Sequence, residues 1–186
     1  KVKEFSGHIH EVSANTFKLL ENLLEWSRSQ TGKIGFNPKA IDIRIPVKNA
    51  KDLMFPVARK KNIDIVLDVP PIAVLVDEHM MHTVLQNILS NALKYSNNGC
   101  NIFISAREKK DKLLLSIKDE GVGMDQDTLS KLFRIDETVS TFGTDGERGT
   151  GLGLILSKEF IERHRGKIIA TSEKGIGSEF IIELPL

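Results

Sequence analysis

The chain has 186 residues, of which 40% are hydrophobic and 27% are charged, and its formal net charge is +1. This composition is typical of a folded globular domain, and it lacks the domain-wide basic surface that nucleic-acid binding requires. The longest apolar run, residues 72–76, is far shorter than the roughly 20 residues needed to span a bilayer.

The first predicted element is a helix from about Ser13 to Gln30, a stretch without glycine or proline. Its apolar residues form two adjoining stripes, which is typical of a helix that packs against more than one neighbour in a bundle. Gly32 and Pro38 then interrupt the pattern and predict a linker. The stripes consist of Phe17, Leu20 and Leu24, and of Leu19, Leu23 and Trp26.

From residue 37 onwards, strand and helix patterns alternate. We predict strands over 40–45, 63–69 and 73–76, and a helix over 46–62 that Pro56 should kink or shorten. The later predicted elements are a helix over 77–95, a hairpin of strands 101–108 and 112–119, a short helix near 127–133, a helix over 152–164, and a hairpin of strands 167–173 and 178–185. Because this order is not a strict βαβ alternation, we expect an α+β fold, a two-layer sandwich with a mixed sheet and helices on one face.

Polar residues line one side of the predicted 77–95 helix, opposite its apolar face. Asn87, Asn91 and Lys94 are spaced so that they lie on one stripe. Amide oxygens can ligate a hard cation, and an ammonium group attracts phosphate. A solvated helix face is the alternative for this pattern alone. The predicted apolar face consists of Leu85, Ile88, Leu89 and Ala92.

A carboxylate follows the apolar face of the strand over 112–119. The strand places alternate residues from Leu113 to Ile117 on one face, and Asp119 continues this parity, so its side chain should point inward. A buried carboxylate needs a hydrogen-bond donor, and Gly121 and Gly123 would let a flat ligand approach the backbone. This combination suits an adenine ring, whereas the alternative is a strand end followed by an Asp-Gly turn.

Three glycines, Gly149, Gly151 and Gly153, precede the predicted 152–164 helix. Their spacing is not GxGxxG and they do not follow a strand, so a Rossmann site is excluded, and no GxxxxGK[ST] sequence is present. Bare backbone amides at the positive end of a helix dipole suit a polyphosphate. The alternative is a flexible loop that ends at a helix cap.

Together these segments resemble the ATP-binding catalytic domain of two-component sensor histidine kinases, in the GHKL (Bergerat-fold) superfamily. The resemblance covers about residues 37–186 and implies a Bergerat fold. Residues 1–36 are then expected to be a remnant of the dimerisation hairpin, its second helix, together with a linker. The similar motifs are the N box (QNILSNALKYS, 86–96), the G1 box (DEGVGM, 119–124), the F box (LFR, 132–134), the G2 box (GTGLGL, 149–154) and a last glycine motif (GIGSEF, 175–180).

The resemblance implies ATP and Mg²⁺ as ligands. Asn91 would ligate Mg²⁺, Lys94 would pair with a phosphate, and Asp119 would accept the adenine amino group. Residues 133–148 would form a lid that excludes water when it closes. The expected nucleotide-binding residues are Asn87, Asn91, Lys94, Tyr95, Asp119, Gly121, Gly123, Phe133, Arg134, Arg148, Gly149, Thr150, Gly151, Leu152, Gly153 and Ser178.

Two absences shape the expected activity. The ATP hydrolases of the superfamily use a glutamate where this chain has Asn87, and an amide cannot act as a general base. We therefore expect phosphoryl transfer by positioning, without efficient hydrolysis. Of the five histidines, only His10 precedes an acid, and its context lacks the expected proline, so the acceptor histidine and every catalytic residue are expected outside this chain. His79 and His82 could suggest a metal pair, but surface histidines are the simpler reading.

The expected function is therefore the catalytic domain of a sensor histidine kinase. Its expected partners are the histidine-bearing hairpin of its parent, a homodimer, and a response-regulator receiver domain, with no nucleic-acid or membrane contact by this part. A nucleotide-sensing pseudokinase module and a GHKL-type ATPase are the alternatives. The single cysteine, Cys100, favours a reducing, cytoplasmic setting and a small buried side chain. The start at Lys1 suggests an excised piece, compatible with a membrane-anchored parent.

Overall fold

The structure is a computed structural model that describes residues 35–134, 142–147, 149 and 151–186. In the predicted N-terminal helix it describes only isolated positions, all of them helical and exposed: Ser13, Thr16, Phe17, Leu20, Leu23, Leu24 and Ser27. The rest of that helix, including Trp26, and both His8 and His10 lie outside the described residues. None of the helices in the described part is long and apolar enough to span a membrane.

A mixed five-stranded sheet forms one layer of the fold. Its central strand, β5, is antiparallel to both β4 and β7, and β2 at one edge runs parallel to its neighbour β4. A separate antiparallel pair joins β1 to β3. In spatial order the main sheet contains β2 (Asp64–Asp68), β4 (Asn101–Glu108), β5 (Lys112–Asp119), β7 (Gly177–Pro185) and β6 (Lys167–Glu173), and the small pair contains β1 (Lys39–Asp42) and β3 (Ala73–Val76).

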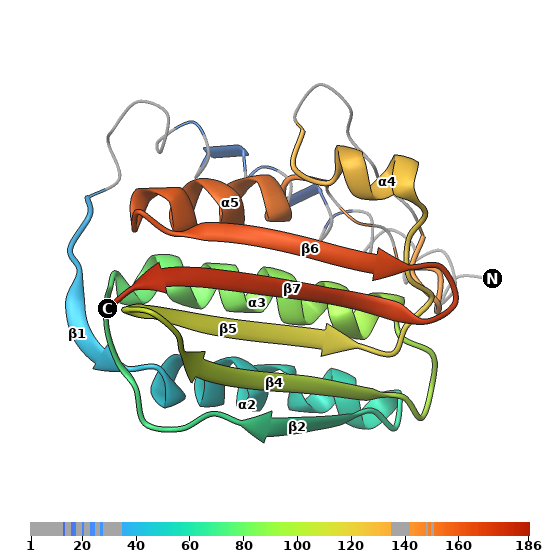
Figure 1. The fold of residues 1–186 in the computed structure, drawn as a ribbon. Helices are drawn as coiled ribbons and strands as arrows, with labels where there is room; N and C mark the ends of the chain where they lie inside the picture. Colours follow the sequence, from blue (N-terminus) through green and yellow to red (C-terminus); the bar gives the residue numbers. More distant parts are fainter. Residues whose placement is uncertain are drawn as a thin grey trace.

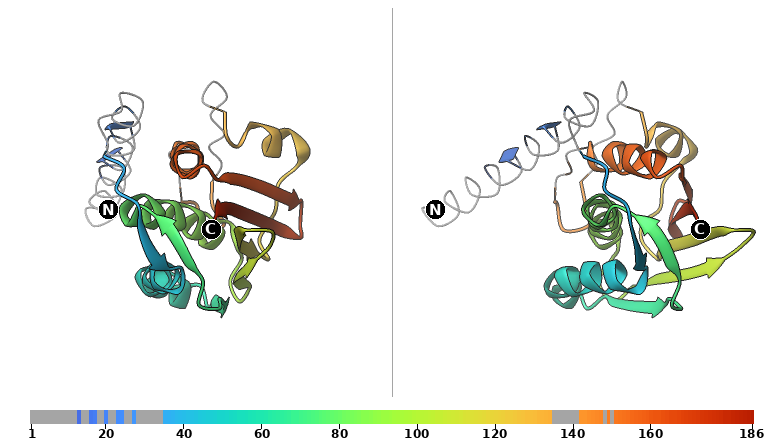
Figure 2. Two further views of the ribbon diagram at one scale, coloured as in Figure 1. Left: turned by 60° about the vertical axis from the view of Figure 1, so that its left-hand side comes forward. Right: turned by 90° about the vertical axis from the view of Figure 1, so that its left-hand side faces the viewer.

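Three helices form the second layer, on one face of the sheet (Figures 1 and 2). The middle helix, α3 (Glu78–Tyr95), packs between α2 (Arg44–Lys60) and α5 (Gly153–Arg163). The short helix α4 (Gln126–Lys131) contacts β6 at one end of the sandwich. The core lies between the layers, because the apolar faces of helices and strands bury each other there. The predicted apolar face of α3 is fully part of it: Leu85, Ile88, Leu89 and Ala92 are buried.

The predicted α+β sandwich with helices on one face is therefore confirmed, but two local expectations are wrong. The predicted strand 40–45 ends at Asp42, because the Asp42 carboxylate accepts the amide of Arg44 at 3.0 Å and turns the chain into α2. Pro56 also does not shorten α2 as expected, because the helix continues to Lys60. Pro56 is exposed, while buried Ala50 and Ala58 on either side of it keep the helix against the core.

Cys100 also differs from expectation. It is half-buried rather than buried, and its Sγ donates to the carbonyl of Glu120 at 3.3 Å.

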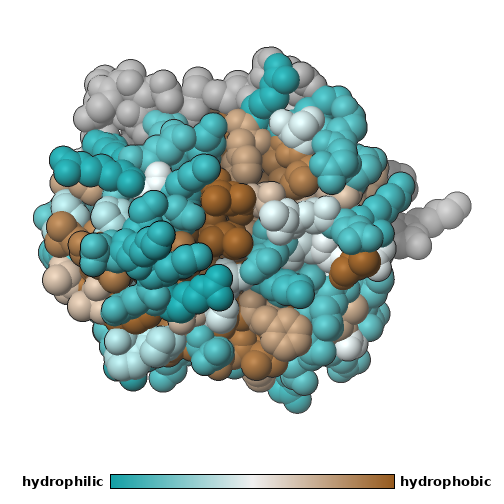
Figure 3. Space-filling view, viewed as in Figure 1, coloured by the Kyte–Doolittle hydropathy of each residue, from teal (hydrophilic) through white to brown (hydrophobic). Residues whose placement is uncertain are grey.

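The outer face of the sheet is mixed in character, with small hydrophobic patches among hydrophilic side chains (Figure 3). Val66 and its register partner Phe103 are both exposed, at 45% and 38%.

One end of the sandwich gathers the segments that carry the sequence motifs. Figure 1 shows toward its right-hand side the end of α3, the end of β5 and the β6–β7 turn, and the start of α5 is the end of that helix nearer to them. These are the N box, the G1 box, the last glycine motif and the G2 box, which are far apart in the sequence. The fold thus brings the predicted site together.

Candidate functional site

A cavity of about 450 Å³ opens at this end of the sandwich, between α3, the end of β5, α4 and the start of α5. Gly121, Phe133 and Leu152 are described but do not line it, and Arg148 and Thr150 lie outside the described residues. The predicted residues that line it are Asn87, Asn91, Lys94, Tyr95, Asp119, Gly123, Arg134, Gly149, Gly151, Gly153 and Ser178.

Asp119 lies at the end of β5 and is buried, with 3% of the residue exposed, as its strand parity predicts. Its Oδ1 accepts the backbone amides of Gly121 at 2.9 Å and Ser178 at 3.2 Å. Burial raises the pKa of Asp119, and these two hydrogen bonds offset only part of that effect. Among the described residues no donor reaches Oδ2. The cavity therefore holds a buried acceptor with one oxygen available to a ligand.

The glycines after Asp119 have a reason that the sequence did not reveal. Gly123 has a φ of +61°, and a Cβ there would collide with the backbone carbonyl of Glu173. A Cβ on Gly121 would collide with the carbonyl of Tyr95. Both positions are thus constrained by neighbouring backbone of the same chain, whether or not a ligand is bound.

The polar stripe of α3 faces the cavity, and its members differ in their partners. Asn87 donates to the carbonyl of Gly153 at 3.1 Å and to Oγ of Ser157 at 3.3 Å, which ties α3 to α5. Two turns further along α3, Lys94 donates to the hydroxyl of the adjacent Tyr95 at 2.9 Å. The side-chain amide of Asn91 forms no hydrogen bond within the described part of the chain, so its oxygen is available to a cation.

The start of α5 presents backbone amides to the same cavity. Leu152, at the N-cap, makes no side-chain cap hydrogen bond, and the first turn has no acidic residue. The preceding Gly151 has a φ of +74°, a conformation that other residues rarely adopt. A Cβ on Gly149 would come within 2.9 Å of Lys94 Nζ. This end of the helix therefore combines open amides, the positive end of a dipole and a nearby ammonium group.

Sequence reasoning missed most of the apolar wall and several polar residues at the rim. Val122, Met124 and Leu154 belong to the recognised motifs, so their positions in those motifs could have indicated them. Phe142, which is 71% exposed, lies in the predicted lid of residues 133–148, although it is not among the expected nucleotide-binding residues. The missed lining residues are Ser90, Val122, Met124, Asp125, Thr128, Lys131, Leu132, Phe142, Leu154, Lys174 and Phe180.

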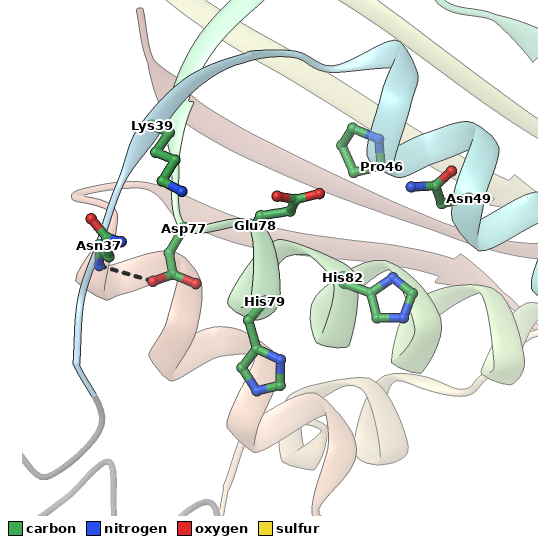
Figure 4. A pocket seen from close by; sticks show the side chains of 8 residues that line it. All are labelled: Asn37, Lys39, Pro46, Asn49, Asp77, Glu78, His79 and His82. Carbon is green, nitrogen blue, oxygen red and sulfur yellow. Dashed lines mark hydrogen bonds between the residues drawn. The ribbon is translucent and has the colours of Figure 1, made fainter.

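A second cavity, of about 460 Å³, lies at the opposite end of α3. His79 and His82 line it, but Figure 4 shows their rings apart, without a common point toward which both are directed. No group of three or more potential metal ligands occurs among the described residues. The Asp77 carboxylate accepts the amide of Asn37 at 2.9 Å and that of Met80 at 3.1 Å, so it serves the fold. The polar groups that are available to a ligand therefore line the first cavity.

Comparison with known proteins finds a family match over the part of the chain that lines the first cavity. Residues 76–186 match the model of the family described as histidine kinase-, DNA gyrase B-, and HSP90-like ATPase. Sporulation kinase E of Bacillus subtilis (strain 168) is 42% identical over 125 residues, which cover 67% of this chain and 16% of that protein.

Two solved structures share the fold. Full-length ShkA in complex with AMPPNP has a TM-score of 0.80 and 25% identity, covering 98% of this chain and 38% of that one. Histidine kinase ThkA in complex with response regulator protein TrrA has a TM-score of 0.79 and 20% identity, covering 100% of this chain and 51% of that one. This chain thus spans less than two thirds of the length of each of these three proteins.

Proposed function

This chain belongs to the family of histidine kinase-, DNA gyrase B- and HSP90-like ATPases, and from that premise we propose that it is the ATP-binding catalytic domain of a sensor histidine kinase. It transfers the γ-phosphoryl group of ATP to a histidine that lies outside this chain. Residues 37–186 form the catalytic domain, and residues 1–36 are the end of a dimerisation hairpin and its linker. The domain works where ATP is available, in the cytoplasm.

The observation that carries the proposal is the Asp119 carboxylate. Two backbone amides hold its Oδ1, and Oδ2 accepts no hydrogen bond from the described residues of the cavity it lines. A buried acceptor of this kind binds an exocyclic amine, and adenine carries one. The apolar wall around it, with Val122, Met124 and Phe180, suits the flat faces of a purine.

The phosphate end of the nucleotide lies toward α5 in this proposal. The uncapped first turn of α5 and the ammonium group of Lys94 both favour negative charge. The donor set fits Mg²⁺, because the Asn91 amide oxygen is a hard ligand without a hydrogen-bond donor in the described part of the chain. Bound Mg²⁺ would neutralise part of the charge on the triphosphate.

Asn87 favours transfer over hydrolysis. It lines the cavity, but its amide cannot remove a proton from water, and its Nδ2 is engaged by Gly153 and Ser157 of α5. The chain then contributes orientation and electrostatics, while the acceptor comes from outside. We propose a homodimeric parent and a response-regulator receiver domain as the next acceptor. The complex of ThkA with a response regulator, a protein of the same fold, supports that choice.

Thermal unfolding with and without Mg·ATP tests nucleotide binding. A ligand at one hundred times its dissociation constant stabilises the folded state by about 2.7 kcal/mol. Adding the histidine-bearing hairpin of the parent and [γ-³²P]ATP should then produce phosphate that is labile in acid and stable in base. Binding without transfer would favour the pseudokinase alternative. Steady ATP turnover without the hairpin would favour an ATPase, and no stabilisation would reject the proposal.

A further inference from the structure

Lys61, the C-cap residue of α2, is a buried cation outside the nucleotide cavity. It is 2% exposed, whereas the adjacent Lys60 is exposed to solvent. Lysine is rarely buried to this degree unless its ammonium group is paired. No feature of the sequence RKKN separates Lys61 from its basic neighbours, so only the structure identifies it.

The Lys61 ammonium group joins two segments that are distant in sequence. Its Nζ donates to the carbonyl of Leu93 at 3.1 Å, near the end of α3. On the other side it donates to Thr144 Oγ1 at 2.9 Å and forms an ion pair with Glu147 Oε1 at 2.9 Å. Burial raises the pKa of Glu147, but hydrogen bonds from Lys61 and from backbone amides outweigh it and hold that pKa below its ordinary value.

The segment 142–147 is itself fastened to the end of α3. The amide of Thr144 donates to the carbonyl of Lys94 at 3.0 Å, and its hydroxyl donates to the carbonyl of Ser96 at 2.8 Å. Within the segment, the amide of Gly143 donates to the carbonyl of Glu147 at 2.8 Å. Lys61 is thus the charged centre of a polar junction between this segment and α3.

This junction bears on the nucleotide cavity through the residues on its two sides. Phe142 and Gly149 line the cavity on either side of the junction, and Lys94 lines it from α3. Gly149 lies close to the Lys94 ammonium group, since a Cβ on that glycine would come within 2.9 Å of Nζ. A change in how the segment sits on α3 therefore changes the wall beside Lys94.

We propose that Lys61 is a positioning residue for nucleotide binding: it holds the segment 142–147 on the end of α3 and so keeps Phe142 and Gly149 at the phosphate end of the cavity. Lys61 does not itself line the cavity. The inference rests on the proposed function, because it assumes that the cavity binds ATP with its phosphates near Lys94.

The substitution Lys61→Met removes the ammonium group and keeps an unbranched apolar side chain in its place. The Glu147 side chain is 39% exposed, so its carboxylate can turn to water, and the segment can leave α3 without unfolding the core. If the binding-competent arrangement is then populated one tenth of the time, the apparent dissociation constant for ATP rises about tenfold. Adenosine has no phosphates and should be affected little.

The test compares Mg·ATP and adenosine binding to the whole chain by isothermal titration calorimetry. For Lys61→Met we expect about tenfold weaker ATP binding, and adenosine binding within about twofold of the wild type. Glu147→Gln should also weaken ATP binding. The double variant should bind ATP no more weakly than Lys61→Met, because both substitutions break the same ion pair. Lys60→Met is the matched control and should bind both ligands normally.

The outcomes are distinguishable. If the wild type binds neither ligand, the proposed function fails. If the wild type binds both and Lys61→Met binds ATP equally well, the positioning role is rejected while the proposed function stands. Equal weakening of ATP and adenosine, together with a lower midpoint of thermal unfolding, would show a merely structural role for Lys61 and would also reject the inference.

Discussion

Polar side chains near the two ends of α3 have different roles: those at its start stabilise the fold, and those near its other end are available to a ligand. At its start, Asp77 caps the helix through the amide of Met80, and the Asp77 amide donates to Nε2 of buried His164 at 2.8 Å. His164 Nδ1 in turn lies 2.6 Å from the carbonyl of Phe160, to which it donates. Near its other end, the Asn91 side chain has no hydrogen-bond partner in the described chain, and Asp119 of β5 keeps one oxygen without a donor.

This contrast separates groups that stabilise the fold from groups available to a ligand. Buried polar atoms in folded proteins are nearly always hydrogen-bonded, so a network that closes on itself needs no ligand. A cavity whose acceptors are only partly satisfied has capacity for one. We therefore expect substitutions at the start of α3 to lower the free energy of unfolding without changing ATP affinity. Substitutions of the unsatisfied acceptors at the cavity should lower ATP affinity without changing the free energy of unfolding.

The largest expected effect is that of Asp119→Asn on nucleotide binding. The new amide can keep its oxygen on the Gly121 and Ser178 amides, which turns an NH₂ group toward the adenine amine. We expect ATP affinity to fall about a hundredfold, which corresponds to about 2.7 kcal/mol. The raised pKa of Asp119 means that its ionised form opposes folding at neutral pH, so stability without ligand should not fall.

Calorimetric titration and urea unfolding measure these two quantities. Asp111→Asn, the same change in the turn between β4 and β5, is the control and should leave ATP affinity unchanged. Unaltered binding by Asp119→Asn would contradict the adenine site. A large loss of stability would place Asp119 with the fold-stabilising groups instead.

The second effect concerns stability at the first end of α3. His164→Ala leaves the buried Asp77 amide without its acceptor, and we expect a loss of roughly 2 kcal/mol in the free energy of unfolding. Affinity for ATP should be unchanged once both proteins are folded. Urea unfolding at pH 7.5 measures the first quantity and titration the second. A parallel loss of affinity would break the separation between the two ends.

The same histidine predicts a pH dependence. Burial lowers the pKa of His164, and its hydrogen bond with Phe160 and the charge of Asp77 offset this only in part. The folded state therefore binds fewer protons than the unfolded state below the unfolded pKa of about 6.5. The stabilisation is present above that pH and is lost as the pH falls toward the folded pKa. Unfolding at pH 7.5 and 5.5 should show this loss in the wild type and less of it in His164→Ala. His79→Ala, an exposed histidine on α3, should behave as the wild type.

The smallest effect is that of Asn91→Ala on the contribution of Mg²⁺. We expect ATP binding in Mg²⁺ to weaken about tenfold, and binding in EDTA to match the wild type in EDTA. Because the described chain gives the amide no partner, stability should change by less than about 0.5 kcal/mol. Asn98→Ala, an exposed amide after α3, is the control. An equal loss with and without Mg²⁺ would argue against Asn91 as a ligand.

Much of the fold could be predicted because its signals are local. The helix α3 and the β4–β5 hairpin follow from apolar periodicity, and the inward direction of Asp119 follows from the parity of a single strand. The residues of the recognised motifs mostly meet at one cavity. The continuation of α2 past Pro56 could not be predicted from local propensity, because buried Ala50 and Ala58 outweigh the local effect of Pro56.

The sequence by itself determined the order of the elements, the inward carboxylate and the glycine-rich entry to α5, since each depends on neighbours along the chain. Only the tertiary structure decided that Gly121 and Gly123 are constrained by backbone of distant segments, and that Lys61 rather than Lys60 pairs with Glu147. Such contacts join residues that are far apart in the chain. They leave no periodicity or spacing, because burial and pairing arise only when the layers pack.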